Sequence, residues 1–368
     1  MTKFIHLALF SLFLSACGTR EKSDALRLMI WGDASELSAV QSFVRGFEQS
    51  HPGTQVRIFS VNPTDYNQSL QSLYLKKQSP DVFYVSRDWA SFYAHRGMLQ
   101  DLSTFIDADR EFDFNDFYPA GRDSFLYKGR PYAVAKDFTT MVLYYNEDLF
   151  KKAGVGLPNS KWTWSDLRSA AMKLTRDADN DGAPEQYGFA VDTWLGWMMP
   201  WIWQAGGDFL DEKGEKGVAG VTPYFEQNVR AFQFLYDLIH KDKCAPDAKV
   251  VDQVGIPSLF IGGKLAMCVY GLWACLNFKE IRDFRWNVAP LPRNKNKATV
   301  VLTVGYGISS RTKKPNDAGE LVKHLTGIEG QTQVAQSGLA VPARKSVAQS
   351  PQFLRAPFLP AFVDNRVF

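Results

Sequence analysis

Three short apolar runs in the first quarter of the chain have the length and composition of buried strands: 26–31, 55–61 and 80–85. Between them, apolar residues recur every three or four positions, as on the buried face of a helix: Val40, Phe43, Val44 and Phe47, then Tyr66, Leu70, Leu73 and Tyr74. This order predicts a mainly parallel sheet with helices on both faces. Ligands of such sheets bind beyond the carboxyl ends of the strands, so Trp31 and Asp88 stand out.

The segment 127–154 contains two further strand patterns that are separated only by polar residues. The apolar pattern of the first strand breaks at Lys136 and Asp137, and a second strand follows at 141–145. Ionisable groups are costly to bury without partners. We therefore predict that the chain crosses here from one lobe to another, with Lys136 and Asp137 at the crossing, where ligands commonly bind. Both side chains are expected to make polar contacts with the ligand.

Four tryptophans fall within ten residues: Trp194, Trp197, Trp201 and Trp203. Indole faces stack on sugar rings, but the spacing also fits the buried face of a helix. A membrane-surface helix is a third interpretation, weakened because the segment contains no Lys or Arg. We expect Trp197 to line a cleft and the others to lie in a core.

The long helix after Pro223 is predicted to bury Val229, Phe232, Leu235, Tyr236 and Ile239.

An acidic loop follows the helix predicted at 164–174. Its D-x-D-x-D-G spacing places Asp177, Asp179 and Asp181 around a glycine turn, as calcium loops do, and Glu185 could add a further carboxylate. The twelfth position is Gly188 instead of the glutamate of a complete EF-hand, which excludes that motif. An acidic turn between helix and strand is the favoured interpretation, and a bound Ca²⁺ is the alternative.

The N-terminus has the pattern of a signal peptide. Lys3 precedes an apolar run at 5–14 that is too short to span a bilayer. Leu14-Ser15-Ala16-Cys17 resembles a lipobox, in which the cysteine becomes the lipidated first residue. An ordinary secretory signal with a chance cysteine is the alternative. We expect residues 1–16 to be removed and 17–26 to form a lipidated tether that anchors the protein to a membrane outside the cytoplasm, in the periplasm or at the cell surface.

Length and composition limit the classes of function. At 368 residues, the chain is long enough for two domains. Its 42 Lys and Arg nearly balance 39 Asp and Glu, so no strong positive field indicates nucleic acid. The sequence contains no P-loop, G-x-S-x-G, H-E-x-x-H or dinucleotide-binding fingerprint.

Three cysteines remain beyond Cys17: Cys244, Cys268 and Cys275. Cys268 and Cys275 could pair, but separate buried thiols are favoured.

Several motifs resemble a known family. They are G-x-P-Y-A-V at 129–134, L-Y-Y-N-x-D-L-F-x-x-A-G at 143–154, W-T-W at 162–164 and G-x-x-A-M-x-x-x-G-x-W at 263–273. Together they resemble the solute-binding proteins of bacterial ABC importers, in the branch of the maltose-binding protein. The resemblance implies a type II periplasmic-binding-protein fold, with two hinged α/β lobes, each a mainly parallel sheet flanked by helices. We assign 27–135 and 273–325 to lobe 1, and 136–272 and 326–368 to lobe 2.

The resemblance also implies roles for particular residues. Trp273 would stack on the ligand, Asp88 would bind sugar hydroxyls, Gly305 would lie at the cleft and Arg344 could face the ligand. Each has a structural alternative: core packing for Trp273, a helix N-cap for Asp88, close backbone approach for Gly305 and a surface loop for Arg344. Relatives usually continue in C-terminal helices beyond the equivalent of Phe368, so the chain is either truncated or lacks them.

These features predict a monomeric, lipid-anchored binding protein without a cofactor that delivers a carbohydrate to the permease of an ABC importer. Ligand binding would favour closure of the two lobes. A secreted glycosidase is the alternative, in which two cleft carboxylates would act as acid and base. A surface adhesin or sensor that keeps the binding fold is a third.

Overall fold

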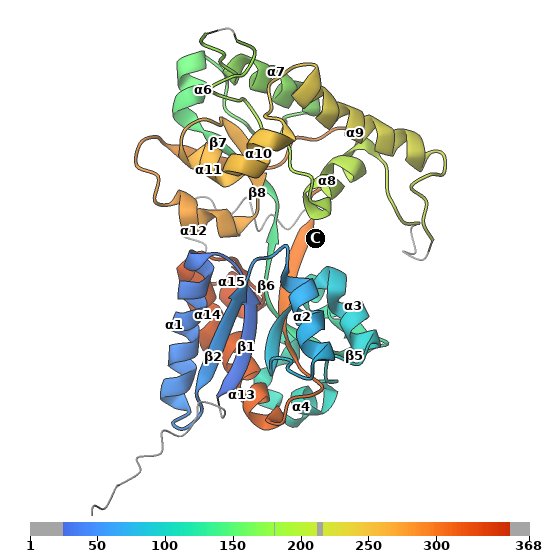
Figure 1. Ribbon diagram of the computed structural model, residues 1–368, viewed down its shortest axis with the longest axis vertical. Helices are drawn as coiled ribbons and strands as arrows, with labels where there is room; N and C mark the ends of the chain where they lie inside the picture. Colours follow the sequence, from blue (N-terminus) through green and yellow to red (C-terminus); the bar gives the residue numbers. More distant parts are fainter. Residues whose placement is uncertain (1–24, 180, 212–215, 354–368) are drawn as a thin grey trace, which may run out of the picture.

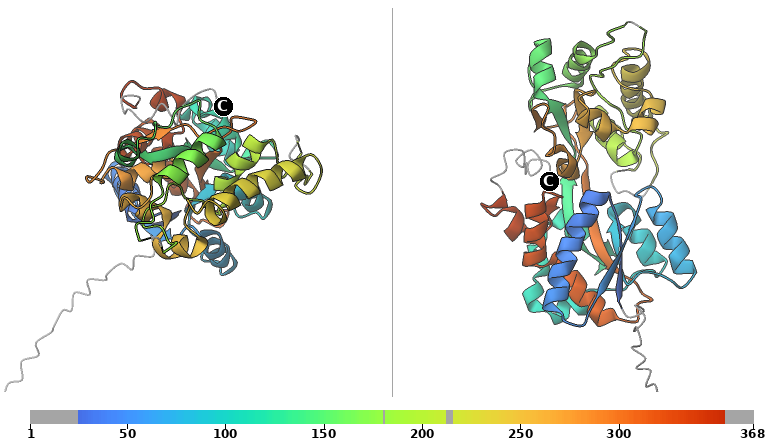
Figure 2. Two further views of the ribbon diagram at one scale, coloured as in Figure 1. Left: turned by 90° about the horizontal axis from the view of Figure 1, so that it is seen from above. Right: turned by 60° about the vertical axis from the view of Figure 1, so that its left-hand side comes forward.

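The computed structural model describes residues 25–179, 181–211 and 216–353. The predicted signal peptide, Cys17 and most of the tether lie outside the described residues, as does the end of the chain from 354 onward. Figure 1 shows two lobes stacked along the long axis, and Figure 2 shows the connecting strands between them. The two-lobed α/β architecture agrees with the prediction.

Lobe 1, the lower lobe in Figure 1, is built on a six-stranded sheet of order β11-β6-β10-β3-β1-β2. Its strands are β1 (Leu26–Trp31), β2 (Val56–Val61), β3 (Val82–Ser86), β6 (Ala133–Thr140), β10 (Val301–Ile308) and β11 (Val341–Pro342). β1 pairs in parallel with β2 and β3, as the apolar runs predicted. β10 and β11 add antiparallel pairs, so this sheet is mixed rather than mainly parallel.

Helices surround the sheet of lobe 1: α1 (Ala34–Ser50), α2 (Tyr66–Leu75), α3 (Arg87–His95), α4 (Ser103–Ala108), α5 (Pro119–Asp123), α13 (Pro315–Thr326), α14 (Ile328–Ser337) and α15 (Lys345–Ala348). A small hairpin, β4 (Leu126–Tyr127) with β5 (Arg130–Pro131), precedes β6. α1 buries Val40, Phe43, Val44 and Phe47, the predicted set. Asp33 caps α1 by accepting hydrogen bonds from the backbone N–H groups of Ser35 and Glu36.

Lobe 2 contains a three-stranded sheet in which β7 (Val142–Asn146) lies between β8 (Met267–Tyr270) and β9 (Trp286–Ala289). Both pairings are antiparallel, so the prediction of a mainly parallel sheet is wrong for this lobe. Its helices are α6 (Glu147–Ala153), α7 (Trp164–Leu174), α8 (Leu195–Ala205), α9 (Tyr224–His240), α10 (Ala248–Val254), α11 (Ile256–Ile261) and α12 (Cys275–Phe278). The capping box at Thr163 and Asp166 starts α7 as its sequence predicts.

Within the described residues, two neighbouring connections join the lobes. β6 of lobe 1 runs directly into β7 of lobe 2 at Thr140 and Met141, and residues 290–300 lead from β9 back to β10. Val301 pairs with Thr140, and the Thr299 hydroxyl donates a hydrogen bond to the Met141 carbonyl at 2.9 Å. In Figure 1, β6 rises between the lobes beside the orange strand β10. Paired strands that change lobe together can act as a hinge.

The predicted lobe boundaries need correction in three segments. Residues 136–140 belong to β6, so the crossing lies at 140–141. The prediction places 273–289, with α12 and β9, in lobe 1, but β9 pairs with β7 in lobe 2, and Cys275 and Phe278 of α12 lie in a buried cluster that centres on lobe 2. The described part of 326–368 was assigned to lobe 2, yet β11 pairs with β6 of lobe 1 through Val341 and Pro342. Local patterns indicate a strand, whereas the edge that it joins depends on partners far away in sequence.

Three clusters of buried apolar side chains fill the molecule: one in lobe 1 and two that centre on lobe 2. The thiols of Cys244, Cys268 and Cys275 are buried and free, which agrees with the favoured interpretation of separate thiols. Within the described residues, no helix combines the length and the apolar character that crossing a membrane would require.

Candidate functional site

Trp273 lies where the cores of the two lobes meet. It follows β8 in the short helix η4 (Leu272–Ala274), is partly exposed, and packs against all three buried clusters. Its indole ring folds back over Gly271, where a Cβ atom would overlap the ring. Residue 271 must therefore be glycine for the Trp273 indole to occupy this position. Trp273 is the sequence-predicted residue that the structure places best for a ligand held between lobes.

Other polar and aromatic groups of lobe 2 adjoin Trp273. The Tyr270 ring meets it edge-on, with ring centroids 6.4 Å apart. Burial, and secondarily the charge of Asp192, raise the pKa of Tyr270, so its hydroxyl stays protonated and can donate a hydrogen bond. The Asp192 carboxylate accepts a hydrogen bond from the backbone N–H of Trp194 at 3.0 Å. Sequence reasoning missed Asp192 and Tyr270, which carry no motif of their own.

The prediction that Trp197 lines a cleft is wrong. Trp197 is 1% exposed, and its indole N–H donates to the Val269 carbonyl at 3.2 Å inside the core of lobe 2. Trp194, just before α8, is 45% exposed. Its ring lies against Gly196, where a Cβ atom would be 2.6 Å from the indole. The helical spacing indicated a common face but not which tryptophan would remain outside the core.

On lobe 1, Lys136 and Asp137 form a buried ion pair. Val304 of β10 pairs with Asp137 and Gly305 with Ala135, so Lys136 is the extra residue of a β-bulge. The bulge breaks the alternation of side chains and lets neighbouring residues pair. The Lys136 ammonium also lies 3.6 Å from the Glu36 carboxylate of α1. The sequence-based inference that these ionisable groups need partners is confirmed.

The surroundings of this cluster keep the Lys136 ammonium protonated and make the Glu36 carboxyl harder to ionise. Burial alone would lower the pKa of Lys136, but the carboxylates of Asp137 and Glu36 outweigh it, and the pKa is raised. Burial raises the pKa of Glu36, and the charge of Lys136 offsets this only in part. Glu36 was missed because Asp33-x-x-Glu36 has the spacing of a capping box. Its side chain lies within ion-pair distance of Lys136.

Glu36 should make stability depend on pH. Because its pKa is higher in the folded protein than in the unfolded chain, folding binds a proton more tightly there. Stability is therefore greatest below the unfolded pKa and falls as pH rises through the folded pKa. We expect Glu36→Gln to raise the melting temperature at neutral pH and to lose this advantage below about pH 4. Thermal melts across pH check this, with Glu320→Gln on an exposed face of α13 as the control. An equal effect of both variants would contradict it.

A polar contact links the lobes beside this cluster. The Asn277 amide of α12 donates to the Asp33 carboxylate at 2.9 Å, and the Ser35 hydroxyl donates to the Asn277 oxygen at 3.2 Å. Trp31, at the end of β1, meets the rings of Tyr66 and Tyr84 edge-on at 4.7 and 5.0 Å. The carboxyl end of β1 is therefore close to lobe 2, as expected for a ligand site beyond the carboxyl ends of parallel strands. The Trp31 ring is held there by Tyr66 and Tyr84.

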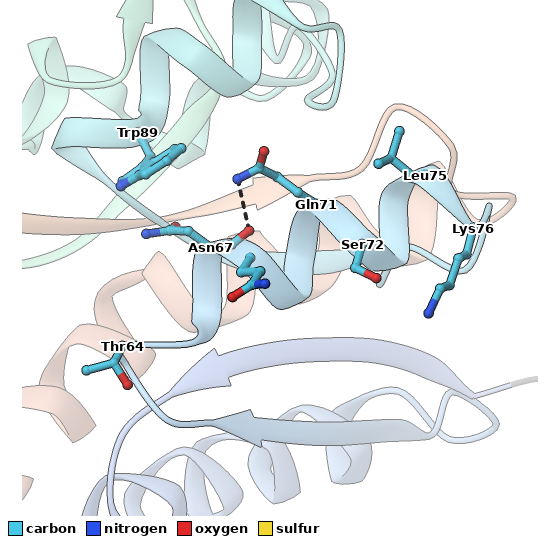
Figure 3. Close-up of a pocket in the computed structure, with 8 residues that line it drawn as sticks. Thr64, Asn67, Gln71, Ser72, Leu75, Lys76 and Trp89 are labelled. Atoms are coloured by element: carbon cyan, nitrogen blue, oxygen red, sulfur yellow. Dashed lines mark hydrogen bonds between the residues drawn. The ribbon is translucent and has the colours of Figure 1, made fainter.

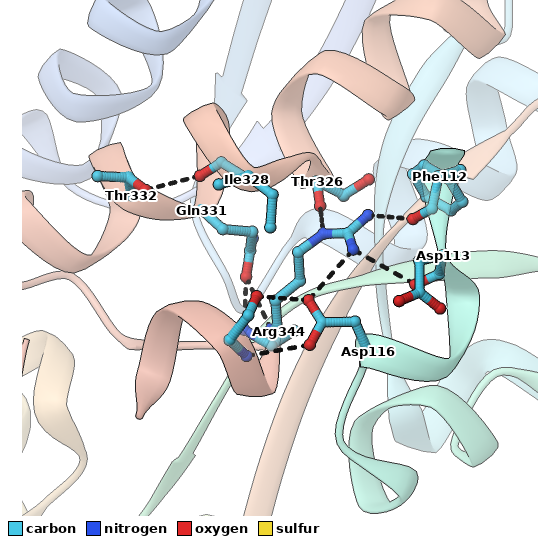
Figure 4. Close-up of polar contacts among 10 residues, drawn as sticks. Phe112, Asp113, Asp116, Thr326, Ile328, Gln331, Thr332 and Arg344 are labelled. Atoms are coloured by element: carbon cyan, nitrogen blue, oxygen red, sulfur yellow. Dashed lines mark hydrogen bonds and ion pairs between the residues drawn. The ribbon is translucent and has the colours of Figure 1, made fainter. Parts of the chain in front are cut away.

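Arg344 does not face a ligand, so that prediction is wrong. It is 3% exposed, and Figure 4 shows its guanidinium surrounded by acceptors. It donates to the carbonyls of Thr326 at 2.7 Å and Phe112 at 2.6 Å, and it pairs with the Asp116 carboxylate at 3.3 Å. These contacts tie the end of α13 to the segment before α5. Arg344 therefore holds two segments of lobe 1 together, and the alternative of a surface-loop residue is also wrong.

For Gly305 and Asp88 the structure tests only the structural alternatives, and their places in a binding site stay predictions. Beside Gly305, a Cβ atom would meet the Phe125 ring and the Val134 carbonyl at 3.0 Å, so the glycine permits close packing, as its structural alternative stated. Asp88 lies in the exposed first turn of α3, whose N-cap is Ser86, so the N-cap alternative is wrong. A role of Asp88 in binding stays a prediction.

The acidic loop brings three of its four predicted carboxylates together. Oxygens of Asp177, Asp179 and Glu185 lie within 4.8 Å of one another, whereas Asp181 is not part of this group. These carboxylates accept backbone N–H groups: Ala178 donates to Glu185 at 2.8 Å, Gly182 to Asp177 at 3.0 Å and Asp181 to Asp179 at 3.2 Å. Such bonds are what the acidic-turn interpretation requires. Calcium binding stays a prediction.

Two α/β lobes joined by paired strands, with aromatic and ionic groups where they meet, define the class of hinged ligand-binding proteins. Residues 31–332 match the family described as bacterial extracellular solute-binding protein, and the chain belongs to this family. The resemblance stated from the motifs is thereby confirmed. Members of this family bind solutes and are not enzymes. The glycosidase alternative therefore does not fit the family.

Particular relatives support the same placement. A galactooligosaccharide-binding protein of Bacillus subtilis (strain 168) is 24% identical over 385 residues, covering 99% of this chain and 85% of its own. A maltotriose-binding protein of Pyrococcus abyssi (strain GE5 / Orsay) is 27% identical, covering 72% and 53%. Among solved structures, the ABC substrate-binding protein Lmo0181 from Listeria monocytogenes, in complex with cycloalternan, has a TM-score of 0.83 at 26% identity, covering 92% and 86%.

Proposed function

We propose that this protein captures a carbohydrate between its lobes and delivers it to the permease of an ABC importer. The observation that carries the proposal is the aromatic group of lobe 2, in which Trp273 and Tyr270 adjoin the crossing and Asp192 adds a carboxylate. Indole and phenol rings offer apolar faces to sugar rings, while hydroxyl and carboxylate groups fix their orientation. The ligands named for the relatives, galactooligosaccharide and maltotriose, support a saccharide.

Transport would use closure of the hinge at the paired strands. A ligand that contacts both lobes favours the closed arrangement by the contacts it makes only there. Lobe 1 would contribute Trp31 and Asp88 from its strand ends, and lobe 2 would contribute Trp194 and Trp273. Lys136 and Asp137 are 2% and 5% exposed. We therefore propose that they fix the shape of β6 ahead of the crossing instead of contacting the ligand.

The N-terminus would hold the protein at a membrane. We propose that Cys17 is lipidated and that residues up to 26 form the tether, with the protein acting as a monomer outside the cytoplasm. The described chain begins at the end of lobe 1 that points away from the crossings. A lipid attached there would leave the region between the lobes free to meet solute and permease.

A thermal-shift screen of the chain from residue 17 onward tests the proposed function. We expect saccharides to raise the melting temperature, because a ligand at a hundred times its dissociation constant adds about 2.7 kcal/mol to the stability of the folded state. The panel includes monosaccharides, oligosaccharides, polyols and their phosphates, and each ligand is recovered and analysed. A shift with polyol phosphates alone would contradict the carbohydrate assignment. Recovery of cleaved saccharide would contradict a binding protein and support the glycosidase alternative.

A further inference from the structure

An open groove runs along α2 on lobe 1, apart from the groups around Trp273. Its volume is about 610 Å³, within the usual range for small-ligand sites. Figure 3 shows Trp89 at one end and Leu75 and Lys76 at the other, with the amide side chains of α2 between them. Neither the proposed hinge site nor the packing of lobe 1 accounts for this groove.

Trp89 forms a fixed platform at its end of the groove. Its indole stacks on Tyr93, with centroids 5.7 Å apart and planes at 28°, and it meets Phe92 edge-on at 5.3 Å. The Tyr93 hydroxyl in turn donates to the Asn67 side-chain oxygen at 2.7 Å, which links the aromatic stack to α2. One side of Trp89 is thus held by the protein, while the ring also lines the groove. An aromatic ring fixed in this way loses little freedom when a ligand stacks on it.

The polar groups of the groove suit a neutral ligand rich in hydroxyls. Asn67 uses its oxygen for Tyr93, and the Gln71 amide N–H donates to the Asn67 backbone carbonyl at 3.1 Å. Neither bond uses the Asn67 amide hydrogens or the Gln71 side-chain oxygen, and Gln68 adds a donor and an acceptor. Lys76, at the far end, is the one charged residue among the described groups that line the groove.

The groove begins at the carboxyl ends of the strands that face lobe 2. Thr64 follows the end of β2 by three residues, and Trp89 follows the end of β3 by three. Tyr66, the first residue of α2, contacts Trp31 at the end of β1. We propose that the groove binds the outer sugar units of an oligosaccharide whose other end lies between the lobes. This inference rests on the proposed function and narrows it from carbohydrate to oligosaccharide.

Affinity as a function of ligand length tests the inference. Calorimetric titrations use the full mature chain with malto-, galacto- and manno-oligosaccharides, starting at the disaccharide and adding one unit at a time. The unmodified protein should bind longer chains more tightly. Trp89→Ala should weaken binding of the longer chains about tenfold, the effect of losing one stacked ring, and leave disaccharide affinity unchanged. Gln71→Ala, which leaves the Trp89 and Tyr93 stack intact, should show the same length dependence with a smaller loss.

Tyr236→Ala is the matched control, because it removes a 56% exposed aromatic ring from α9 of lobe 2. It should leave affinities at every length unchanged. Equal loss at all lengths in Trp89→Ala and Gln71→Ala, or no loss at any length, would overturn the groove while leaving the proposed function in place. If the unmodified protein binds no saccharide of any length, both the groove and the proposed function are overturned.

Discussion

Trp273→Ala should weaken saccharide binding strongly and leave a folded, less stable protein. The indole lies at the junction of three buried clusters, beside Tyr270, and a central aromatic anchor of this kind contributes about 2–4 kcal/mol to binding. That loss corresponds to an affinity roughly 30- to 1,000-fold lower. Calorimetric titration with the saccharide that gives the largest thermal shift measures it, and circular dichroism confirms the fold.

Two further variants separate ligand contact from stability. Gly271→Ala keeps Trp273 but places a methyl group where its ring lies, so it should displace the ring and weaken binding by a similar factor. Trp286→Ala removes another partly buried tryptophan of lobe 2, whose indole N–H donates to the Phe278 carbonyl. It should lower stability without abolishing binding. Unchanged affinity in both Trp273→Ala and Gly271→Ala would remove Trp273 from the site.

Lys136→Met should destabilise the protein by about 3–5 kcal/mol, the usual cost of removing one member of a buried ion pair. Lys136 is 2% exposed, pairs with Asp137 and lies 3.6 Å from Glu36. Methionine fills most of the same space, so the loss reflects two carboxylates left without their cation. Chemical denaturation, with the free energy of unfolding extrapolated to water, measures the change.

Charge removal should rescue this variant. Adding Asp137→Asn and Glu36→Gln to Lys136→Met should restore a large part of the lost stability, because no unpaired charge then stays buried. An exposed pair is the control: Arg285 lies 3.0 Å from Asp148, and Arg285→Met should cost at most about 1 kcal/mol. If the Lys136 and Arg285 variants lose the same small amount, the cluster does not hold β6 in place.

The sequence by itself determined the local elements and the family. The apolar stripe of α1 and the capping box of α7 follow from spacings of a few residues. The parallel pairing of β1 with β2 and β3 follows from the alternating order of strand and helix patterns. A single sequence displays both the spacing and the order directly. The motifs around Trp273 likewise identified the residue that lies between the lobes.

Only the tertiary structure decided which face of an element is buried and which lobe a segment joins. The stripe predicted for α9 has the right period, but Val229, Phe232 and Tyr236 are 46%, 39% and 56% exposed. Ala231 and Leu238 are buried in their place. Trp197 became a core residue for the same reason. A helical or strand period is fixed by the local backbone, whereas its phase is set by packing against elements that are distant in sequence.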